Sequence, residues 1–206
     1  RPLISTKVGK LIRPGVREGT ELFGDRQPFY LANLDKRFIF DFSYDGVLRS
    51  HEESLQRLGV DAVDILHIHD PDEHFTDAVQ GAYRALNRLR EEGSIKAVSA
   101  GMNQWEMLSK FLDHGDFDCF LLAGRYTLLD QSSLAELLPK CLKHGTSIVI
   151  GGVYNSGILA NPVPGTTYNY VEAPQDLIDR ALAMDAICQR HGVPLKSAAL
   201  QFPLGH

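Results

Sequence analysis

The sequence predicts a parallel α/β fold, a (β/α)8 TIM barrel of which this chain supplies about five central βα units. Short β-rich runs alternate with helical stretches along the chain, and parallel strands need such a crossover between each pair. No Gly-x-Gly-x-x-Gly turn follows an early strand, so the dinucleotide fingerprint of an open doubly wound sheet is absent. A barrel is therefore favoured over an open sheet.

The individual elements follow from their end signals. Residues 3–9 form a β-rich run closed by glycine, and a helical pattern covers residues 45–58. Ser43 is placed to cap this helix and Gly59 to stop it, and a buried strand at 63–69 follows. The alternation continues with helices expected at 76–92, 105–112, 133–144 and 176–191, and with strands at 95–100, 119–123 and 147–150.

Residues 1–206 are expected to form a single barrel domain that is incomplete at both ends. A barrel is closed by hydrogen bonds between its first and last strands, and alternate strands fill its centre. Five strands are too few for this. We therefore expect two βα units before Arg1 and the final strand after His206.

Residues 10–42 are too long for an ordinary connection between a strand and a helix. Two interpretations stay open: a packed excursion with a short hairpin around residues 37–42, or a lid over a binding site at the barrel mouth. The segment carries six aromatic residues that suit either one: Phe23, Phe29, Tyr30, Phe38, Phe40 and Phe42.

Composition excludes several classes of partner. The 206 residues are 44% hydrophobic and 23% charged, which is typical of one soluble globular domain. With 21 basic and 26 acidic residues, the net charge of -5 offers no broad attraction for nucleic acid or for anionic membranes. The three cysteines, Cys119, Cys141 and Cys188, lie far apart in apolar contexts, which favours buried thiols in a reducing compartment and hence a cytoplasmic location.

Polar residues at two strands are the first candidates for chemistry. His67 and His69 are two positions apart on one strand and therefore share a face. They are either the start of a metal site, as in barrel hydrolases, or a site in which one imidazole hydrogen-bonds a substrate oxygen. Lys7 lies within another β run, where a lysine is costly to bury, so it is either functional or at an exposed strand end.

Several motifs resemble the aldo-keto reductase superfamily. Residues 54–59 read Ser-Leu-Gln-Arg-Leu-Gly before a strand ending in His69, which is similar to the family's helix before its catalytic histidine. Residues 4–7, Ile-Ser-Thr-Lys, resemble the catalytic-lysine strand, and residues 93–98, Gly-Ser-Ile-Lys-Ala-Val, resemble the Gly-Lys-Ile-Arg strand entry. The match covers nearly the whole chain in the right order.

Three further segments are most similar to the branch that contains D-threo-aldose 1-dehydrogenase, L-fucose dehydrogenase and pyridoxal 4-dehydrogenase. They are residues 101–103, Gly-Met-Asn; residues 124–131, Gly-Arg-Tyr-Thr-Leu-Leu-Asp-Gln; and residues 151–159, Gly-Gly-Val-Tyr-Asn-Ser-Gly-Ile-Leu. The family's catalytic set is Asp, Tyr, Lys and His. The resemblance carries over only Lys7 and His69, and it places the Asp and the Tyr upstream of Arg1.

The resemblance also implies cofactor-binding residues. Asn103 is expected to reach the nicotinamide carboxamide, and residues 152–156 are expected to present backbone amides to the pyrophosphate. The candidates are Asn103, Gly151, Gly152, Tyr154 and Ser156. Structural alternatives are that Asn103 caps the next helix and that the two glycines only allow close packing.

The resulting hypothesis is an NAD- or NADP-dependent oxidoreductase that moves a hydride between nicotinamide and a small-molecule carbonyl or sugar. The substrate is an aldose such as L-fucose, or a small aldehyde or alcohol, and no metal is needed. Two alternatives stay open. One is a dinucleotide-binding regulatory subunit without turnover, and the other is a metal-dependent hydrolase that uses His67 and His69.

Overall fold

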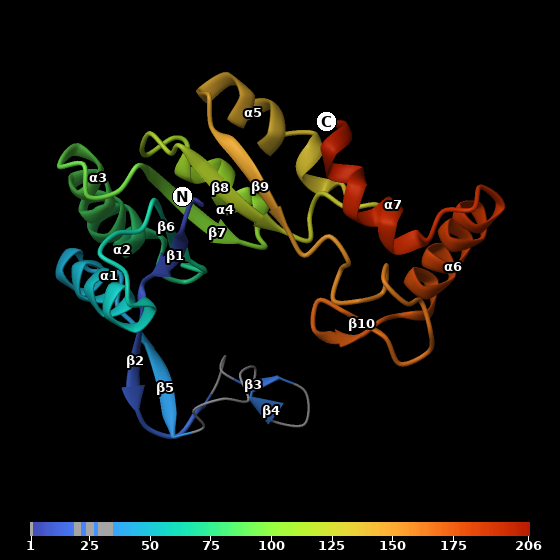
Figure 1. Ribbon diagram of the computed structural model, residues 1–206, viewed down its shortest axis with the longest axis horizontal. Helices are drawn as coiled ribbons and strands as arrows, with labels where there is room; N and C mark the ends of the chain where they lie inside the picture. Colours follow the sequence, from blue (N-terminus) through green and yellow to red (C-terminus); the bar gives the residue numbers. More distant parts are fainter. Residues whose placement is uncertain (1, 19–21, 24–26, 29–34) are drawn as a thin grey trace.

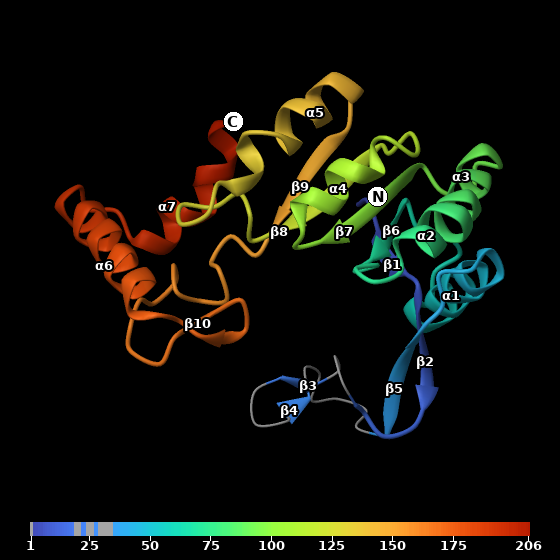
Figure 2. The same cartoon turned by 180° about the vertical axis from the view of Figure 1, so that it is seen from behind.

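The computed structural model describes residues 2–18, 22, 23, 27, 28 and 35–206. Its centre is a five-stranded sheet in the order β1-β6-β7-β8-β9, in which every neighbouring pair is parallel. Figures 1 and 2 show this sheet from its two sides, with the helices along one face. The strands are β1 (Ser5–Val8), β6 (Ile65–His69), β7 (Ala97–Met102), β8 (Cys119–Ala123) and β9 (Ser147–Gly151). The predicted parallel α/β architecture is confirmed.

The helical crossovers pack against one face of this sheet. They are α1 (Tyr44–Leu58), α2 (Phe75–Asp77), a π-helical turn (Ala78–Tyr83), α3 (Arg84–Glu91), α4 (Trp105–Phe111) and α5 (Leu137–His144). Leu66 and Ile68 of β6 are fully buried in the cluster that these helices form with the sheet. Burying such a side chain contributes about 1.5–3 kcal/mol of hydrophobic free energy.

The side chains between these core residues point to the opposite face. Lys7, His67, Ser99 and Cys119 are register partners across β1, β6, β7 and β8, so their side chains share one side of the sheet. That side is the interior of the barrel. The two-residue period of the strands thus separates core residues from the polar residues predicted to carry chemistry.

The end signals of α1 hold in the structure. The Ser43 hydroxyl accepts a hydrogen bond from the Gly46 amide at 3.1 Å, and Gly59 ends the helix in the left-handed region with a φ of 64°. Two other expectations need correction. The helix expected at 76–92 spans Phe75–Glu91, but its Ala78–Tyr83 part is a π-helical turn, in which Gly81 packs so close to the Phe42 backbone that a side chain would not fit.

Strand β7 is the second correction, since it starts and ends two residues later than expected. Its ladder with β6 pairs Ile65 with Ala97 and His69 with Gly101. Glycine weakens a strand pattern in sequence, so the extension through Gly101 to Met102 was not predicted.

The long segment after β1 begins with an antiparallel hairpin. Strand β2 (Lys10–Pro14) pairs with β5 (Lys36–Phe40), and β3 (Leu22–Phe23) pairs with β4 (Gln27–Pro28). The hairpin expected around residues 37–42 is confirmed, with its partner strand immediately after β1. Figure 1 shows it extending beyond the carboxyl end of β1. Phe29 and Tyr30 lie outside the described residues.

The last part of the chain has its own small core. It comprises β10 (Thr167–Tyr168), β11 (Val171–Glu172), α6 (Gln175–Arg190) and α7 (Leu195–Gln201), followed by a 3-10 turn at Phe202–Gly205. Ile158, Leu159 and Leu195 are among the buried residues of this cluster. It holds the long connection after β9 in place. Of the helices described, none is both long enough and apolar enough to cross a lipid bilayer.

Candidate active site

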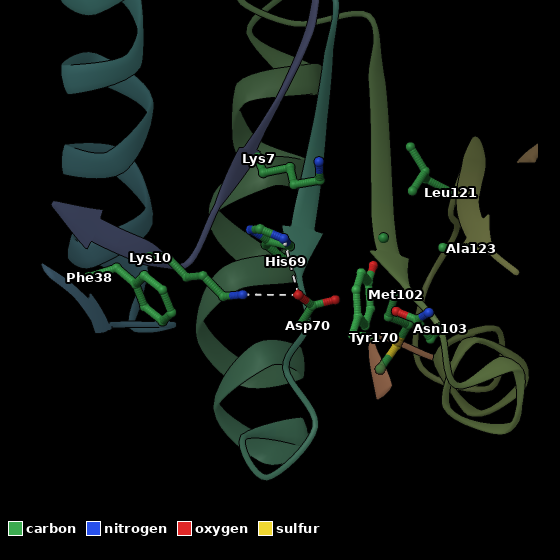
Figure 3. Close-up of a pocket in the computed structure, with 11 residues that line it drawn as sticks. Lys7, Lys10, Phe38, His69, Asp70, Met102, Asn103, Leu121, Ala123 and Tyr170 are labelled. Atoms are coloured by element: carbon green, nitrogen blue, oxygen red, sulfur yellow. Dashed lines mark hydrogen bonds and ion pairs between the residues drawn. The ribbon is translucent and has the colours of Figure 1, made fainter. Parts of the chain in front are cut away.

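A pocket of about 310 Å³ lies at the carboxyl edge of the parallel sheet (Figure 3). In parallel barrels this edge carries the binding and catalytic residues, because every strand ends there and is followed by a loop. Its polar wall is formed by Lys7, Lys10, His69, Asp70, Asn103 and Tyr170. Three of the predicted site residues, Lys7, His69 and Asn103, therefore meet in one pocket.

Lys7 and His69 reach this pocket from adjacent strands. Lys7 is the register partner of His67, so His69 lies one inward-facing position further toward the carboxyl edge. Lys7 is exposed and makes no hydrogen bond or ion pair with any described residue. Its ammonium group is thus held by the strand alone and is open to the pocket.

His67 lies one layer deeper and does not line the pocket. Only 3% of its surface is exposed, and its Nδ1 lies 2.7 Å from the Ser99 hydroxyl. Burial, with the charges of Lys7 and His69, lowers the pKa of His67 from 6.5 to about 4. The imidazole is therefore neutral at physiological pH.

We expect His67 to make the protein less stable as the pH falls from about 6.5 to about 4. The unfolded chain takes up a proton in this interval while the folded chain does not, so protonation favours unfolding. Full stability is present above about pH 6.5, and at most about 3 kcal/mol is lost by about pH 4. Urea unfolding at both ends of this interval measures the loss.

The matched variants for this test are His67→Asn and His144→Asn. Asparagine keeps a polar group at the position of Nδ1 but does not titrate, so His67→Asn should show a smaller loss of stability with falling pH. His144 is exposed on α5 and should be replaceable without effect on this slope. The same slope in wild type and His67→Asn would contradict the assignment.

His69, Asp70 and Lys10 form a hydrogen-bonded group. Nε2 of His69 lies 3.1 Å from Oδ2 of Asp70, and the same oxygen accepts a hydrogen bond from Nζ of Lys10 at 2.9 Å. Burial lowers the pKa of His69, and the hydrogen bond to Asp70 partly opposes this. Because an ionised carboxylate only accepts, Asp70 favours the tautomer of His69 that carries its proton on Nε2.

Asp70 itself is ionised. Burial raises the pKa of this carboxyl, but the hydrogen bond and charge of His69 and the Lys10 ammonium outweigh burial and lower it to about 2. The Lys10 ammonium also lies over the Phe38 and Phe40 rings, at 5.2 and 5.4 Å from their centroids. The β2–β5 hairpin thus closes one side of the pocket.

Asn103 lies on the other side, directly after β7. Helix α4 has Gln104 at its N-cap position with no side-chain capping bond, so Asn103 does not cap it. Its side-chain amide has no hydrogen-bond partner in the described part of the chain and points toward the pocket in Figure 3. It is available to a bound molecule.

The four other predicted cofactor residues lie at the end of β9 and in the loop after it. Gly151 does not line the pocket but lies beside residues that do, since a Cβ there would lie 3.6 Å from Cδ2 of Leu121 and 3.7 Å from Cβ of Ala123. Gly152 has a φ of 61° and packs closely on Gly124, a contact that agrees with either interpretation of this glycine. Tyr154 packs against the second core.

Ser156 connects this loop to the pocket. It has a φ of 61°, and its hydroxyl accepts a hydrogen bond from the backbone amide of Tyr170 at 3.2 Å. Asn155 braces the loop from behind, since its side chain is buried and bonds Thr127 and the Gly124 carbonyl. The loop is held in a defined conformation although several of its residues have left-handed backbones.

Lys10 and Tyr170 are pocket residues that the sequence did not reveal. Gly9, with a φ of 97°, breaks β1 and starts β2, which returns Lys10 to the pocket, and no motif marks this turn. Tyr170 arrives from the turn between β10 and β11, about a hundred residues after His69 in sequence.

A metal site has little support in the described residues. They contain no cluster of three or more His, Cys, Asp or Glu side chains that could hold a metal ion. His67 and His69 are engaged with different partners, Ser99 and Asp70, in different layers of the barrel.

Comparison with known proteins agrees with the geometry. A sequence model of the aldo/keto reductase family matches residues 1–206. The chain is 42% identical over 222 residues to a pyridoxal 4-dehydrogenase of Microbacterium luteolum, covering 100% of this chain and 65% of that protein. It is 40% identical over 205 residues to a D-threo-aldose 1-dehydrogenase of a Pseudomonas species, covering 98% and 62%.

A solved structure shows the same fold. An aldo-keto reductase from Bacillus halodurans in its holo form superposes with a TM-score of 0.70 at 21% identity, covering 99% of this chain and 59% of that one. The chain spans just under two thirds of the length of the two curated relatives. The barrel fold, with about five βα units in this chain, is confirmed. The full-length match and the two relatives at 40% identity or more show that the chain belongs to the aldo/keto reductase family.

Proposed function

We propose that the protein is a nicotinamide-dependent oxidoreductase that interconverts a carbonyl group and a hydroxyl group on a small polar substrate. The observation that carries this proposal is the meeting of Lys7 and His69 in one pocket at the carboxyl edge of the sheet. A neutral His69 carries one N–H, on Nε2, which contacts Oδ2 of Asp70, and a substrate oxygen that shares this N–H with Asp70 would be polarised by it. Lys7 supplies positive charge beside the tyrosine of the family's catalytic set, the residue that we propose transfers the proton.

The residues present fit a dinucleotide. Asn103 offers an unpaired side-chain amide at the pocket, as a partner for a carboxamide. The backbone amides of Val153, Tyr154 and Ser156 donate to no carbonyl among the described residues, as expected for a loop that cradles phosphate oxygens. Gly151 and Gly152 let this loop approach closely. When bound, NAD or NADP supplies or accepts the hydride.

The proposed substrate is an aldose such as L-fucose, or a small aldehyde or alcohol. One relative is called D-threo-aldose 1-dehydrogenase and another pyridoxal 4-dehydrogenase, and both names describe oxidation at a carbon that carries oxygen. The polar wall with two lysines and an ionised carboxylate suits a substrate with several oxygens. The free cysteines, two of them buried, support a reducing compartment, which we propose is the cytoplasm.

The test is a turnover assay of the natural protein with NAD or NADP and a panel of aldoses and small aldehydes. The absorbance of the reduced nicotinamide monitors the reaction. We expect steady-state turnover that persists after treatment with a chelator. Tight dinucleotide binding with no turnover of any substrate would favour a regulatory dinucleotide-binding protein. Activity that is lost with chelator, together with stoichiometric bound zinc, would favour a metal-dependent hydrolase instead.

A further inference from the structure

We propose that Asp70 is a specificity-determining residue that recognises a hydroxyl on the carbon next to the reacting carbon. The pocket would then select α-hydroxy carbonyl compounds, including sugars, over simple aldehydes. The inference rests on the proposed function for the position of the reacting carbon, at Lys7 and His69. It adds the recognition of the neighbouring carbon.

The backbone of Asp70 is fixed in an unusual conformation. Its φ is 44°, in the left-handed region that few residues other than glycine, asparagine and aspartate adopt without strain. Its amide donates to the Gly101 carbonyl at 3.1 Å, which continues the β6–β7 ladder by one position. The carboxylate is therefore presented by the end of a strand, at a site that a mobile loop could not hold as accurately.

One oxygen of this carboxylate is occupied and the other is open. Both contacts, from Lys10 and from His69, go to Oδ2. Oδ1 accepts no hydrogen bond from any residue that the structure describes. In Figure 3 the occupied oxygen faces Lys10 and His69, while the open one points toward Tyr170 across the pocket. The side chain is 36% exposed and lines the pocket.

Lys10 makes this group more than an ordinary surface ion pair. Exposed pairs contribute little because two long side chains must be ordered in water. Here the lysine side chain is only 17% exposed, and its ammonium lies over Phe38 and Phe40 as well as against Asp70. Lys10 is thus a positioning residue that keeps the carboxylate ionised and in one orientation.

An ionised carboxylate with an open oxygen requires a donor. A carbonyl, ether or methyl group cannot provide one, whereas a hydroxyl can. Asp70 is bonded to His69, so a substrate whose reacting oxygen lies at His69 brings the substituent on its neighbouring carbon closest to Asp70. A substrate without that hydroxyl leaves a desolvated charge facing carbon, which is penalised.

Among the described residues, the side of the pocket opposite Asp70 has no comparable charge. Met102, Leu121 and Ala123 line it with apolar groups, and Asn103 is its neutral polar member. Recognition of hydroxyl groups is therefore concentrated at Asp70. This asymmetry gives the substrate one preferred orientation between the two walls.

The experiment uses two pairs of substrates that differ by one hydroxyl: glycolaldehyde against acetaldehyde, and L-fucose against 2-deoxy-L-fucose. We expect the natural protein to favour the hydroxylated member in kcat/KM by about 10- to 100-fold. Asp70→Asn should reduce this preference to a few-fold, and Asp70→Gly should abolish it. Both replacements tolerate the left-handed backbone, so neither strains the strand end.

Asp72→Asn is the matched control, because it removes an exposed carboxylate two residues further on that does not line the pocket. It should keep the full preference. Lys10→Met should lose part of the preference between the two members of each pair, whereas a merely structural role of Lys10 would lower kcat/KM for both members by the same factor.

Each outcome separates the two proposals. If Asp70→Gly lowers kcat/KM by the same factor for both members of a substrate pair, Asp70 acts only through His69. This result would overturn the inference. A wild-type protein that turns over both members equally well would also overturn it while leaving the proposed function intact. A wild-type protein that binds NAD or NADP but turns over none of the four substrates would overturn both.

Discussion

Replacing Lys7 with methionine is expected to lower turnover about a thousandfold while leaving the fold and dinucleotide binding unchanged. Methionine keeps about the length of the side chain and removes its charge. The tyrosine that is proposed to transfer the proton then loses the positive charge that stabilises its ionised form. Lys7 makes no hydrogen bond or ion pair within the described residues and is exposed, so its removal breaks no native contact. Stability should therefore change by no more than about 0.5 kcal/mol.

Three measurements on Lys7→Met decide the matter: kcat, the dinucleotide affinity from a fluorescence titration, and the urea midpoint. Lys143→Met is the control, since Lys143 is exposed on α5 away from the pocket and should be neutral in all three. Near-wild-type turnover in Lys7→Met would show that the proposed role of Lys7 is wrong. A large drop in the urea midpoint would show that the lysine is structural.

His69→Ala is expected to reduce kcat by about 100- to 1000-fold, the usual cost of removing one hydrogen-bond donor to a developing oxyanion. His67→Ala should reduce kcat far less, because His67 lies one layer deeper and bonds Ser99 instead of lining the pocket. Its main effect should be on stability, since it removes a buried side chain that is only 3% exposed. Rapid-quench or single-turnover kinetics at saturating dinucleotide isolate the chemical step.

The comparison of the two histidine variants is the informative result. Their urea midpoints should be measured alongside kcat, so that a loss of folded protein is not read as a loss of catalysis. Equal reductions in kcat, accompanied by stoichiometric bound metal, would show that the two imidazoles act together as ligands. The assignment of His69 to the substrate oxygen would then be wrong.

The parallel fold was predictable because its signals are local. Ser43 and Gly59 delimit α1 by short-range hydrogen bonding and by a left-handed backbone, and both roles are visible in residue type alone. The expected span of β8, residues 119–123, matches the structure because its apolar run has clear ends. The bounds of β7 were wrong at Gly101, where pairing with β6 overrides local propensity, and the π-helical turn that contains Gly81 was not predicted.

The candidate site was predictable only where a family motif marks it. Lys7, His69 and Asn103 lie at strand ends within recognisable segments, and the structure brings them into one pocket. Lys10 and Tyr170 reach the same pocket through turns whose geometry depends on the folded chain, so no spacing in the sequence connects them to His69. The contact between Lys10 and Asp70 joins residues 60 positions apart. Only the three-dimensional arrangement reveals it.

The alternation along β6 has a consequence for how such an enzyme can change its substrate. Leu66 and Ile68 serve the core, while His67 and His69 face the barrel interior. Substitutions at the inward strand end, as at His69, can therefore alter chemistry while Leu66 and Ile68 keep the core, whereas His67, one layer deeper, contributes to stability. On this strand the residue that contacts the pocket differs from the residues that fill the core. Substrate specificity and stability can therefore change independently in evolution, which would not be possible if the binding residues also filled the core.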